Sequence, residues 1–286
     1  MHAAALSFDL LSDVRQLLAY PFMVNALEGA TVVAVVAAVV GWYMVLRRQS
    51  FAGHTLSLMA FPGAAGAALV GLPATLGYYL ACGLAAVSIG GARGRGYRNE
   101  TAAVGTVQAV GLGAGFLFLT LNRAVLGSPE SLLFGNVLGI TRGQVAALVA
   151  VAIGVVIALT VLGRPLLFAT VDPDVARANG VPVSLLDVSF LLILALAVAA
   201  TSQITGALLV FALLVAPPAS AQALTMRPVL GLVLSVCFGL VVTWLGLGIA
   251  YFSIYPVGFF TTTFAFGLYL IARMTAWTLK RRRTGG

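Results

Sequence analysis

Long apolar segments, separated by short polar clusters, follow one another through almost the whole chain. A helix needs about 20 mostly apolar residues to cross the hydrocarbon core of a bilayer. Because 61% of the 286 residues are hydrophobic and only 8% are charged, a single soluble core could not bury these segments. The sequence therefore predicts an all-α, polytopic integral membrane protein with eight or nine transmembrane helices in the lipid of a cell membrane.

Nine segments have the length and composition of membrane spans. Apolar stretches bounded by charge, proline or glycine occupy residues 25–46, 54–71, 74–92, 101–121, 143–162, 185–202, 204–224, 229–250 and 257–277. Eight spans remain an alternative, because 54–71 contains Pro62 and 204–224 contains Pro217 and Pro218. These prolines are expected to break their helices, and the freed carbonyls must be satisfied by protein or by a water-lined cavity. Both segments are therefore expected to face the protein interior.

Basic residues alternate between the two predicted sides of the membrane. Short cytoplasmic loops carry an excess of arginine and lysine. Only Arg15, Arg123 and Arg142 fall on the opposite side. The other thirteen of the sixteen basic residues are Arg47, Arg48, Arg93, Arg95, Arg98, Arg164, Arg177, Arg227, Arg273, Lys280, Arg281, Arg282 and Arg283. The pattern predicts an odd number of spans, with the N-terminus outside and the C-terminus in the cytoplasm.

The spans divide the chain into three parts. Residues 1–24 have the composition of an interfacial amphipathic segment, residues 25–277 form the transmembrane domain, and residues 278–286 form a basic cytoplasmic tail. The connection 122–142 is longer than most and is expected outside. The chain is thus expected to contain no separate soluble domain.

A second long connection, 164–184, is expected on the cytoplasmic side and has the pattern of a short capped helix. Asp172 can cap the helix, Pro173 can occupy its first position, and Arg177 falls within it. Gly180 can adopt the left-handed conformation that closes a helix. A small cytoplasmic helix of this kind is suited to docking a partner, although a merely ordered loop is the alternative.

The sequence lacks the motifs of an enzyme. Its only lysine, Lys280, lies in the basic tail with no glycine-rich loop before it, so the chain cannot bind and hydrolyse ATP through a phosphate-binding loop. Neither His-Glu-x-x-His nor Gly-x-Ser-x-Gly occurs, and no paired carboxylates stand at helical spacing within the predicted spans. The basic residues form small clusters between apolar segments, which is not the pattern of a nucleic-acid-binding surface.

Ionisable residues near spans are the candidates for function, because burying them in hydrocarbon is costly. His54, Glu100 and Asp187 each stand at the start of a predicted span, near its cytoplasmic end. A carboxylate at a helix N-terminus interacts favourably with the helix dipole, which is the simpler interpretation of Glu100 and Asp187. For His54 the alternatives are a satisfied interfacial histidine and a role in transport.

Five stretches of the sequence recur in the order known from one transporter family. They occupy residues 46–63, 99–105, 133–138, 172–182 and 206–221. They include the run from Arg47 and Arg48 through His54 to Pro62, and the run of Gly206 through Pro217 and Pro218. With these stretches the chain resembles the metal-ion ABC transporter permeases, also called type-3 ABC permeases, whose members import zinc, manganese or iron. The resemblance extends from about residue 20 to residue 277.

The resemblance implies a transport complex in the inner, or cytoplasmic, cell membrane. Its expected parts are a homodimer of this chain, two cytoplasmic ATPase subunits and an extracytoplasmic solute-binding protein. ATP and magnesium would bind to the ATPase subunits, so this chain is expected to bind no cofactor and to carry a divalent metal ion, zinc or manganese in the first place. The resemblance makes the segment 164–184 a coupling segment between this chain and the ATPase. The residues expected to contact the ATPase, or to hold the segment in the shape that does so, are Asp172, Asp174, Arg177 and Gly180.

The resemblance also places a substrate pathway at His54, Ser57, Met59 and Glu100. Where the family commonly has an aspartate and a histidine four residues apart, this sequence has His54 and Leu58. We therefore expect His54 to be the metal ligand, with one such residue from each protomer forming a weak, transient site. For Met59 a gap-filling role in packing is the alternative.

Three other functions remain open. A permease for a metal chelate or another small solute would share every feature above. A secondary transporter normally carries ionisable or unwound sites near the bilayer midplane, and the scarcity of carboxylates within the spans counts against it. In a non-transporting membrane scaffold, 164–184 would be an ordinary loop.

Overall fold

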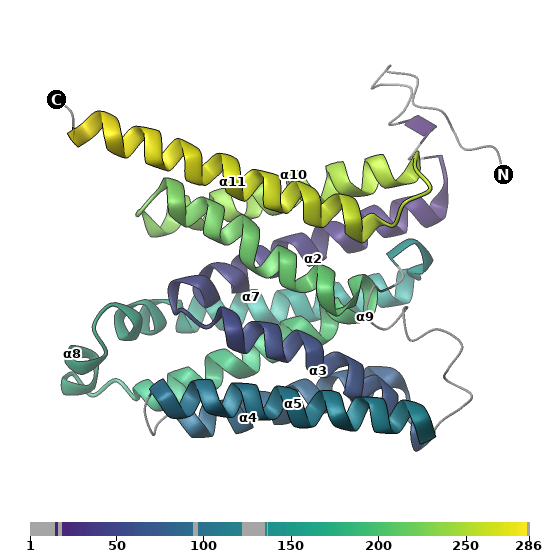
Figure 1. The fold of residues 1–286 in the computed structure, drawn as a ribbon, viewed down its shortest axis with the longest axis horizontal. Coiled ribbons are helices and arrows are strands. Elements are labelled where there is room, and N and C mark those ends of the chain that lie inside the picture. The colour runs from purple at the N-terminus through teal and green to yellow at the C-terminus, as the bar shows by residue number, and fades with distance from the viewer. Residues whose placement is uncertain (1–14, 17–18, 94–96, 122–134, 136, 285–286) are drawn as a thin grey trace. The chain divides into compact units, whose positions relative to one another are not determined.

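The computed structural model describes residues 15–16, 19–93, 97–121, 135 and 137–284 (Figure 1). In this part of the chain all regular structure is helical. The helices are α2 (Pro21–Leu46), α3 (Ser50–Leu69), α4 (Ala74–Arg93), α5 (Tyr97–Leu121), the short 3₁₀-helix η2 (Val137–Gly139), α7 (Arg142–Val171), α8 (Pro173–Ala178), α9 (Val183–Leu224), α10 (Pro228–Tyr251) and α11 (Val257–Thr284).

The prediction of an all-helical membrane protein is confirmed. Within the described residues, seven helical stretches are long and apolar enough to cross a bilayer: Pro21–Leu46, Ala74–Ala92, Thr101–Leu121, Arg142–Val171, Val183–Ala207, Pro228–Tyr251 and Val257–Leu279. The predicted spans 54–71 and 204–224 correspond to α3 and to the shorter apolar helix Leu209–Leu224, which do not reach this standard.

Burial explains why α3 does not need the hydropathy of a lipid-facing span. Thirteen of its twenty residues are buried within the protein, as the sequence predicted for this segment. A helix that contacts protein rather than lipid does not need a continuous apolar surface, because small and polar side chains serve helix packing in membranes.

The helices form two compact units. The first unit comprises residues 1–42, 136–149 and 212–286, and the second unit comprises residues 43–135 and 150–211.

In the first unit, α10 lies between α2 and α11. Hydrogen bonds from Ser235 Oγ to the Ala38 carbonyl (3.1 Å) and from Trp244 Nε1 to Thr31 Oγ1 (2.9 Å) join α10 to α2. On its other side Gly246 lies so close to Thr261 of α11 that a β-carbon at position 246 would be 3.0 Å from the Thr261 backbone nitrogen. Small and hydroxylated residues thus set the spacing between these spans.

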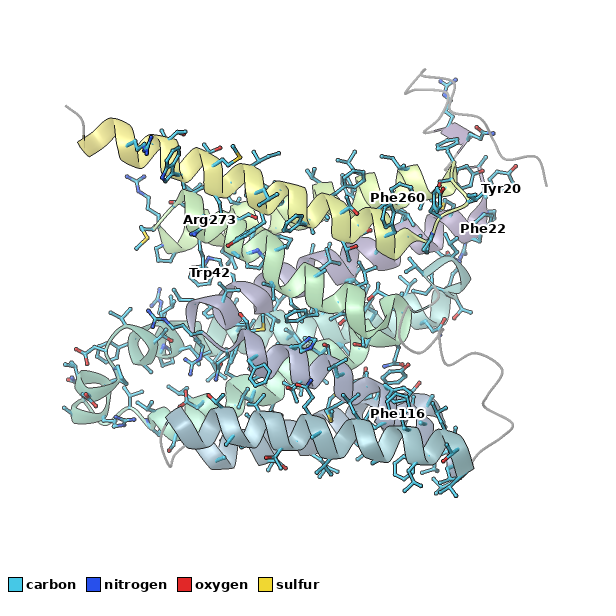
Figure 2. All side chains as sticks on the ribbon, in the orientation of Figure 1. Tyr20, Phe22, Trp42, Phe116, Phe260 and Arg273 are labelled. Carbon is cyan, nitrogen blue, oxygen red and sulfur yellow. The ribbon has the colours of Figure 1, made fainter. Side chains whose placement is uncertain are left out.

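Aromatic side chains gather where α2 begins and α10 ends. Tyr20 and Phe22 lie side by side in Figure 2, with ring centres 5.7 Å apart, and Tyr20 is 6.4 Å from Tyr251. The ring of Phe252 meets that of Tyr251 edge-on at 5.0 Å. Aromatic belts of this kind are typical of the boundary between membrane and water.

In the second unit, α3, α4 and α5 run side by side (Figure 1). Gly63 of α3 and Gly77 of α4 are in backbone contact, since a β-carbon on either would collide with the carbonyl oxygen of the other. A β-carbon at Gly111 of α5 would similarly collide with the side chain of Met59 in α3. The three helices therefore approach one another through glycine.

The path of α9 is interrupted at Gly206, whose dihedral angles (φ 76°, ψ 160°) are not helical. That region of conformational space is open essentially to glycine alone. Pro62 of α3 and Pro217 and Pro218 of α9, where the sequence predicted breaks, lie inside their helices instead. The break thus comes from the one residue type that tolerates the conformation, rather than from the loss of a backbone donor at proline.

Candidate functional site

His54 lies in the second turn of α3, within the second unit, and its side chain is half-buried. The centre of its ring is 4.6 Å from that of Phe211 in α9, and the two planes are tilted by 58°. Its Nδ1 is buried, and none of the residues that the structure describes forms a hydrogen bond with it. A buried polar nitrogen without a partner is costly, so this atom is a candidate for contact with a ligand.

Ser57 and Thr55, next to His54 on α3, are both engaged in hydrogen bonds. Ser57 Oγ donates to the backbone carbonyl of His54 at 2.7 Å, so its proton is used within the helix. Thr55 Oγ1 donates to Gln108 Oε1 of α5 at 2.9 Å and so links the two helices. The structure therefore places Ser57 beside His54, with its oxygen still able to accept a hydrogen bond.

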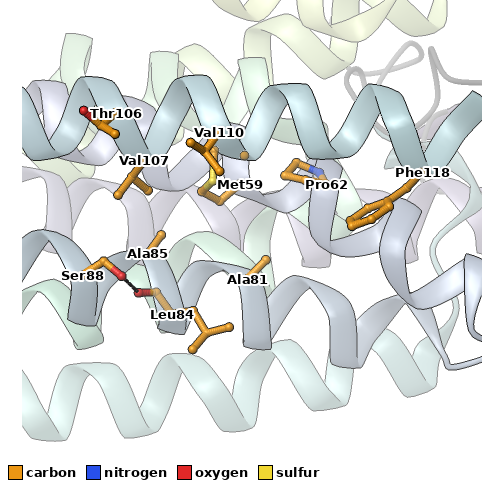
Figure 3. A pocket seen from close by; sticks show the side chains of 11 residues that line it. Met59, Pro62, Ala81, Leu84, Ala85, Ser88, Thr106, Val107, Val110 and Phe118 are labelled. Atoms are coloured by element: carbon orange, nitrogen blue, oxygen red, sulfur yellow. Dashed lines mark hydrogen bonds between the residues drawn. The ribbon is translucent and has the colours of Figure 1, made fainter.

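Met59 lies on another face of α3. Five residues of α-helix separate it from His54, a rotation of about 140° around the helix axis. Its side chain lines a cavity of about 430 Å³ in the second unit (Figure 3). The cavity is lined from α3, α4 and α5 by Met59, Pro62, Ala81, Leu84, Ala85, Ser88, Thr106, Val107, Val110, Gly111 and Phe118.

This cavity has the chemistry of a surface for hydrocarbon. Its two hydroxyls are turned to their own helices. Ser88 Oγ donates to the Leu84 carbonyl at 2.8 Å (Figure 3). Thr106 Oγ1 donates to the Ala102 carbonyl, also at 2.8 Å. None of the residues that line it is charged. Met59 therefore fills space against α5, and His54 lies outside the cavity lining.

The other predicted pathway residue, Glu100, lies in the first turn of α5, but its side chain is outside the part of the structure that is described. Among the described residues, no three histidine, cysteine, aspartate or glutamate side chains come together as a metal cluster. Within the described residues His54 therefore stands as an imidazole outside any such cluster.

The short helix predicted within 164–184 is present as α8. Asp172 is its N-cap and accepts hydrogen bonds from the backbone nitrogens of Asp174 (3.2 Å) and Val175 (3.0 Å). Pro173 is the first helical residue, and Gly180 follows the helix with a φ of 78°. Three local signals were sufficient to predict this helix from the sequence: a carboxylate at the N-cap, proline at the first helical position and glycine after the last turn. Each of them acts within one helical turn.

The surface of α8 is available for contact. Asp174 and Arg177 form an ion pair at 2.8 Å, and their side chains are 89% and 62% exposed. Val175 is also exposed, whereas Ala176 is buried. An exposed ion pair of this type stabilises a helix only slightly, so a partner could replace it with contacts of its own.

Two ionisable residues outside the predicted pathway are buried together. Arg47 was expected among the loop charges, and Asp187 was expected at a solvated helix N-terminus. Instead the Arg47 guanidinium donates to the Asp187 carboxylate and, at 2.9 Å, to the Thr170 hydroxyl. The pairing could have been suspected from opposite charges at the same predicted ends of two spans, but nothing in the sequence selects this pair among several.

These observations define a polytopic helical membrane protein with a polar residue inside its helical core and a small exposed helix suited to a partner. Residues 19–276 match the ABC 3 transport family, and the chain belongs to that family. The resemblance that the sequence predicted is thereby confirmed.

Known members of this group are similar along most of the chain. A manganese transport system membrane protein, MntC, from Halalkalibacterium halodurans is 30% identical over 84% of this chain and 81% of its own length. A chelated iron transport system membrane protein, YfeC, from Yersinia pestis is 30% identical over 84% of this chain and 80% of its own. The solved structure of PsaBC from Streptococcus pneumoniae in complex with Fab matches with a TM-score of 0.81 and 27% identity, over 95% of this chain and 99% of that one.

Family membership settles the role of the chain within its complex. It is the multi-pass membrane permease of an ABC transport system, a subunit without a catalytic role, and it works with ATPase and binding-protein partners. The energy of ATP is therefore supplied from outside this chain.

Proposed function

We propose that this permease imports manganese or iron ions. The observation that carries the proposal is the similarity to the manganese permease of H. halodurans, which extends over 84% of this chain. The similarity to the Yersinia pestis permease adds iron as a second metal. Zinc, which the sequence also suggested, occurs in neither name and is the less favoured ion.

The pathway passes His54. Its unpartnered Nδ1 supplies one nitrogen ligand, and Leu58, one helical turn later, supplies none. In a homodimer two copies of His54, one from each protomer, together form a site of low ligand number. Such a site binds the ion weakly, which suits a permease because conduction requires release as well as binding.

Coupling to ATP takes place at α8. Two cytoplasmic ATPase subunits, which bind ATP and magnesium, dock on the exposed surface around Asp174 and Arg177, while Asp172 and Gly180 hold the helix in shape. The orientation that follows from the arginine distribution, with the N-terminus outside and the C-terminus inside, puts α8 on the ATPase side. A solute-binding protein delivers the ion on the opposite side.

A chelate is the second candidate cargo. The Yersinia pestis relative is described as a chelated iron permease, and one imidazole per chain is a poor site for a bare ion. A chelated metal needs fewer protein ligands, because the chelator supplies them.

The ion is identified by reconstitution. The chain, its co-purifying ATPase and a candidate solute-binding protein are combined in liposomes, and ATP hydrolysis is measured with the binding protein loaded with Mn²⁺, Fe²⁺, Zn²⁺ or a ferric chelate. Stimulation by Mn²⁺ or Fe²⁺ alone supports the proposal, and stimulation by the chelate alone supports the second candidate. If none of the loaded forms stimulates ATP hydrolysis, neither manganese, iron nor the chelate is supported as the cargo.

The docking surface is tested by exchanging its charges. The double variant Asp174→Arg/Arg177→Asp keeps an ion pair at the same spacing but reverses both charges, so α8 should stay folded. We expect ATPase association to weaken by about tenfold or more, as for charge pairs at the contact of two proteins. A matched control is Arg142→Asp at the start of α7, on the predicted outer side, which should leave association unchanged. Unchanged association of the exchanged variant would remove α8 from the docking surface.

A further inference from the structure

The corner between α2 and α3 is held in a fixed conformation. At its centre Arg48 adopts a left-handed conformation (φ 56°), and the backbone nitrogen of Gln49 donates to the Met44 carbonyl at 2.9 Å. Gly53 then lies against the side chain of Met44, where a β-carbon would collide with the sulfur. Because these contacts lock the start of α3 to the end of α2, a movement of Arg47 is passed to the helix that carries His54.

The side chain of Arg47 reaches from this corner to both ends of the segment that contains α8. Its Nη1 donates to Thr170 Oγ1 at 2.9 Å and to the Leu166 carbonyl at 3.4 Å, in the last turns of α7. Its Nη2 donates to the carboxylate of Asp187 in the second turn of α9. In the chain α8 lies between α7, which ends at Val171, and α9, which begins at Val183. Arg47 therefore joins the two helices that flank α8.

The guanidinium is fully enclosed at this junction. The Arg47 side chain is 3% exposed and that of Asp187 14%. The remaining donor, Nε, contacts Gln49 Oε1 at 3.3 Å, and the ring of Phe190 lies 5.3 Å from the guanidinium carbon. A buried ion pair in which each of the three guanidinium nitrogens donates permits few alternative arrangements, because any displacement leaves a charge unpaired in a medium of low dielectric.

We propose that Arg47 is the positioning residue that passes the displacement of α8 to α3 and so to the ion pathway at His54. The inference rests on the proposed docking of the ATPase at α8. When α8 moves with the ATPase, the ends of α7 and α9 move with it, and Arg47 carries that movement to the corner before α3. Arg47 itself contacts neither the ATPase nor the ion.

The test measures how many ions are moved per ATP. The complete transporter is reconstituted in liposomes, and uptake of radioactive Mn²⁺ and release of phosphate are measured together. The main variant is Arg47→Met/Asp187→Leu, because replacing both members of a buried ion pair by apolar residues is tolerated in proteins. The milder variant Arg47→Lys keeps the charge but loses the planar fork that contacts two helices at once.

We expect both variants to bind the ATPase with wild-type affinity, to hydrolyse ATP, and to move about fivefold fewer Mn²⁺ ions per ATP. The control is Arg48→Asn, which removes an exposed positive charge one residue away and suits the left-handed conformation. It should keep the wild-type ratio. A merely structural role for Arg47 would lower the amount of folded protein without changing ions moved per ATP, and that result would overturn the proposal.

Loss of ATPase binding in folded Arg47→Lys would also overturn it, because Arg47 would then shape the docking surface rather than transmit its movement. Failure of the docking proposal itself is seen in a different experiment. There the exchanged Asp174→Arg/Arg177→Asp variant would bind the ATPase normally, whatever the behaviour of Arg47.

Discussion

The guanidinium of Arg47 donates to the carboxylate of Asp187, so an ion pair joins two residues that are 140 positions apart in the chain. Arg47 follows the end of α2, and Asp187 lies in the second turn of α9. Both side chains are largely removed from solvent. A buried charge that loses its partner is strongly unfavourable, so the two residues should behave as one thermodynamic unit.

A double-mutant cycle measures that coupling. Each single variant, Arg47→Met or Asp187→Leu, should lower the free energy of unfolding by about 3 kcal/mol, because the remaining charge is left without its partner. The double variant should lose clearly less than the sum of the two single losses. The measurement is unfolding in detergent, followed by circular dichroism. Strictly additive losses would show that the ion pair does not couple the residues.

The contrast between α8 and Arg47 marks what the sequence could and could not predict. The signals for α8 lie within nine residues, from Asp172 to Gly180, and each acts on its own backbone neighbourhood. The partner of Arg47 is far along the chain, and no local rule selects it. Local chemistry can therefore be predicted from sequence, whereas the pairing of distant charges depends on how the helices pack.

The same distinction holds for the fold and the pathway. The apolar segments predicted the helical membrane domain, because hydrophobic length is a property of each segment alone. The break in α9 was expected at prolines and occurs at Gly206, since the packing of Gly135 against its backbone is not visible in the sequence. The resemblance grouped Met59 with His54 in one pathway, but the two side chains lie on different faces of α3.

Gly206→Ala tests the break in α9. Alanine is strained at φ 76° and ψ 160°, so we expect a loss of about 1 to 3 kcal/mol in the free energy of unfolding. The control is Gly154→Ala in α7, where a β-carbon has no neighbour within 4 Å. That change should be neutral or stabilise the protein by up to about 1 kcal/mol. Equal effects of the two substitutions would mean that Gly206 does not need its left-handed conformation.

Gly63→Ala tests the backbone contact between α3 and α4. The added methyl would meet the carbonyl of Gly77 and lie 2.8 Å from the Ala81 β-carbon, so the helices must separate. We expect a loss of about 1 to 3 kcal/mol, as for other overpacked sites. Gly83→Ala is the control on α4, because its β-carbon would meet no atom within 4 Å. A lower thermal midpoint for the first variant alone, measured by tryptophan fluorescence in detergent, is the expected outcome.

His54→Ala and Met59→Leu separate the two candidates for the ion pathway on α3. His54 has a buried ring nitrogen that forms no hydrogen bond with the described residues, and its loss removes the nitrogen ligand that we propose for the ion. Uptake of radioactive Mn²⁺ by liposomes with the complete transporter should therefore fall by about tenfold or more, as when a ligand or its supporting shell is removed from a metal site.

Met59 packs against Gly111 in an apolar cavity, so the volume-conserving change to leucine should leave uptake unchanged and alter stability by less than about 1.5 kcal/mol. Comparable losses of uptake in both variants would place the pathway in the cavity between α3, α4 and α5, whereas full uptake by His54→Ala would exclude the imidazole as a ligand for the ion.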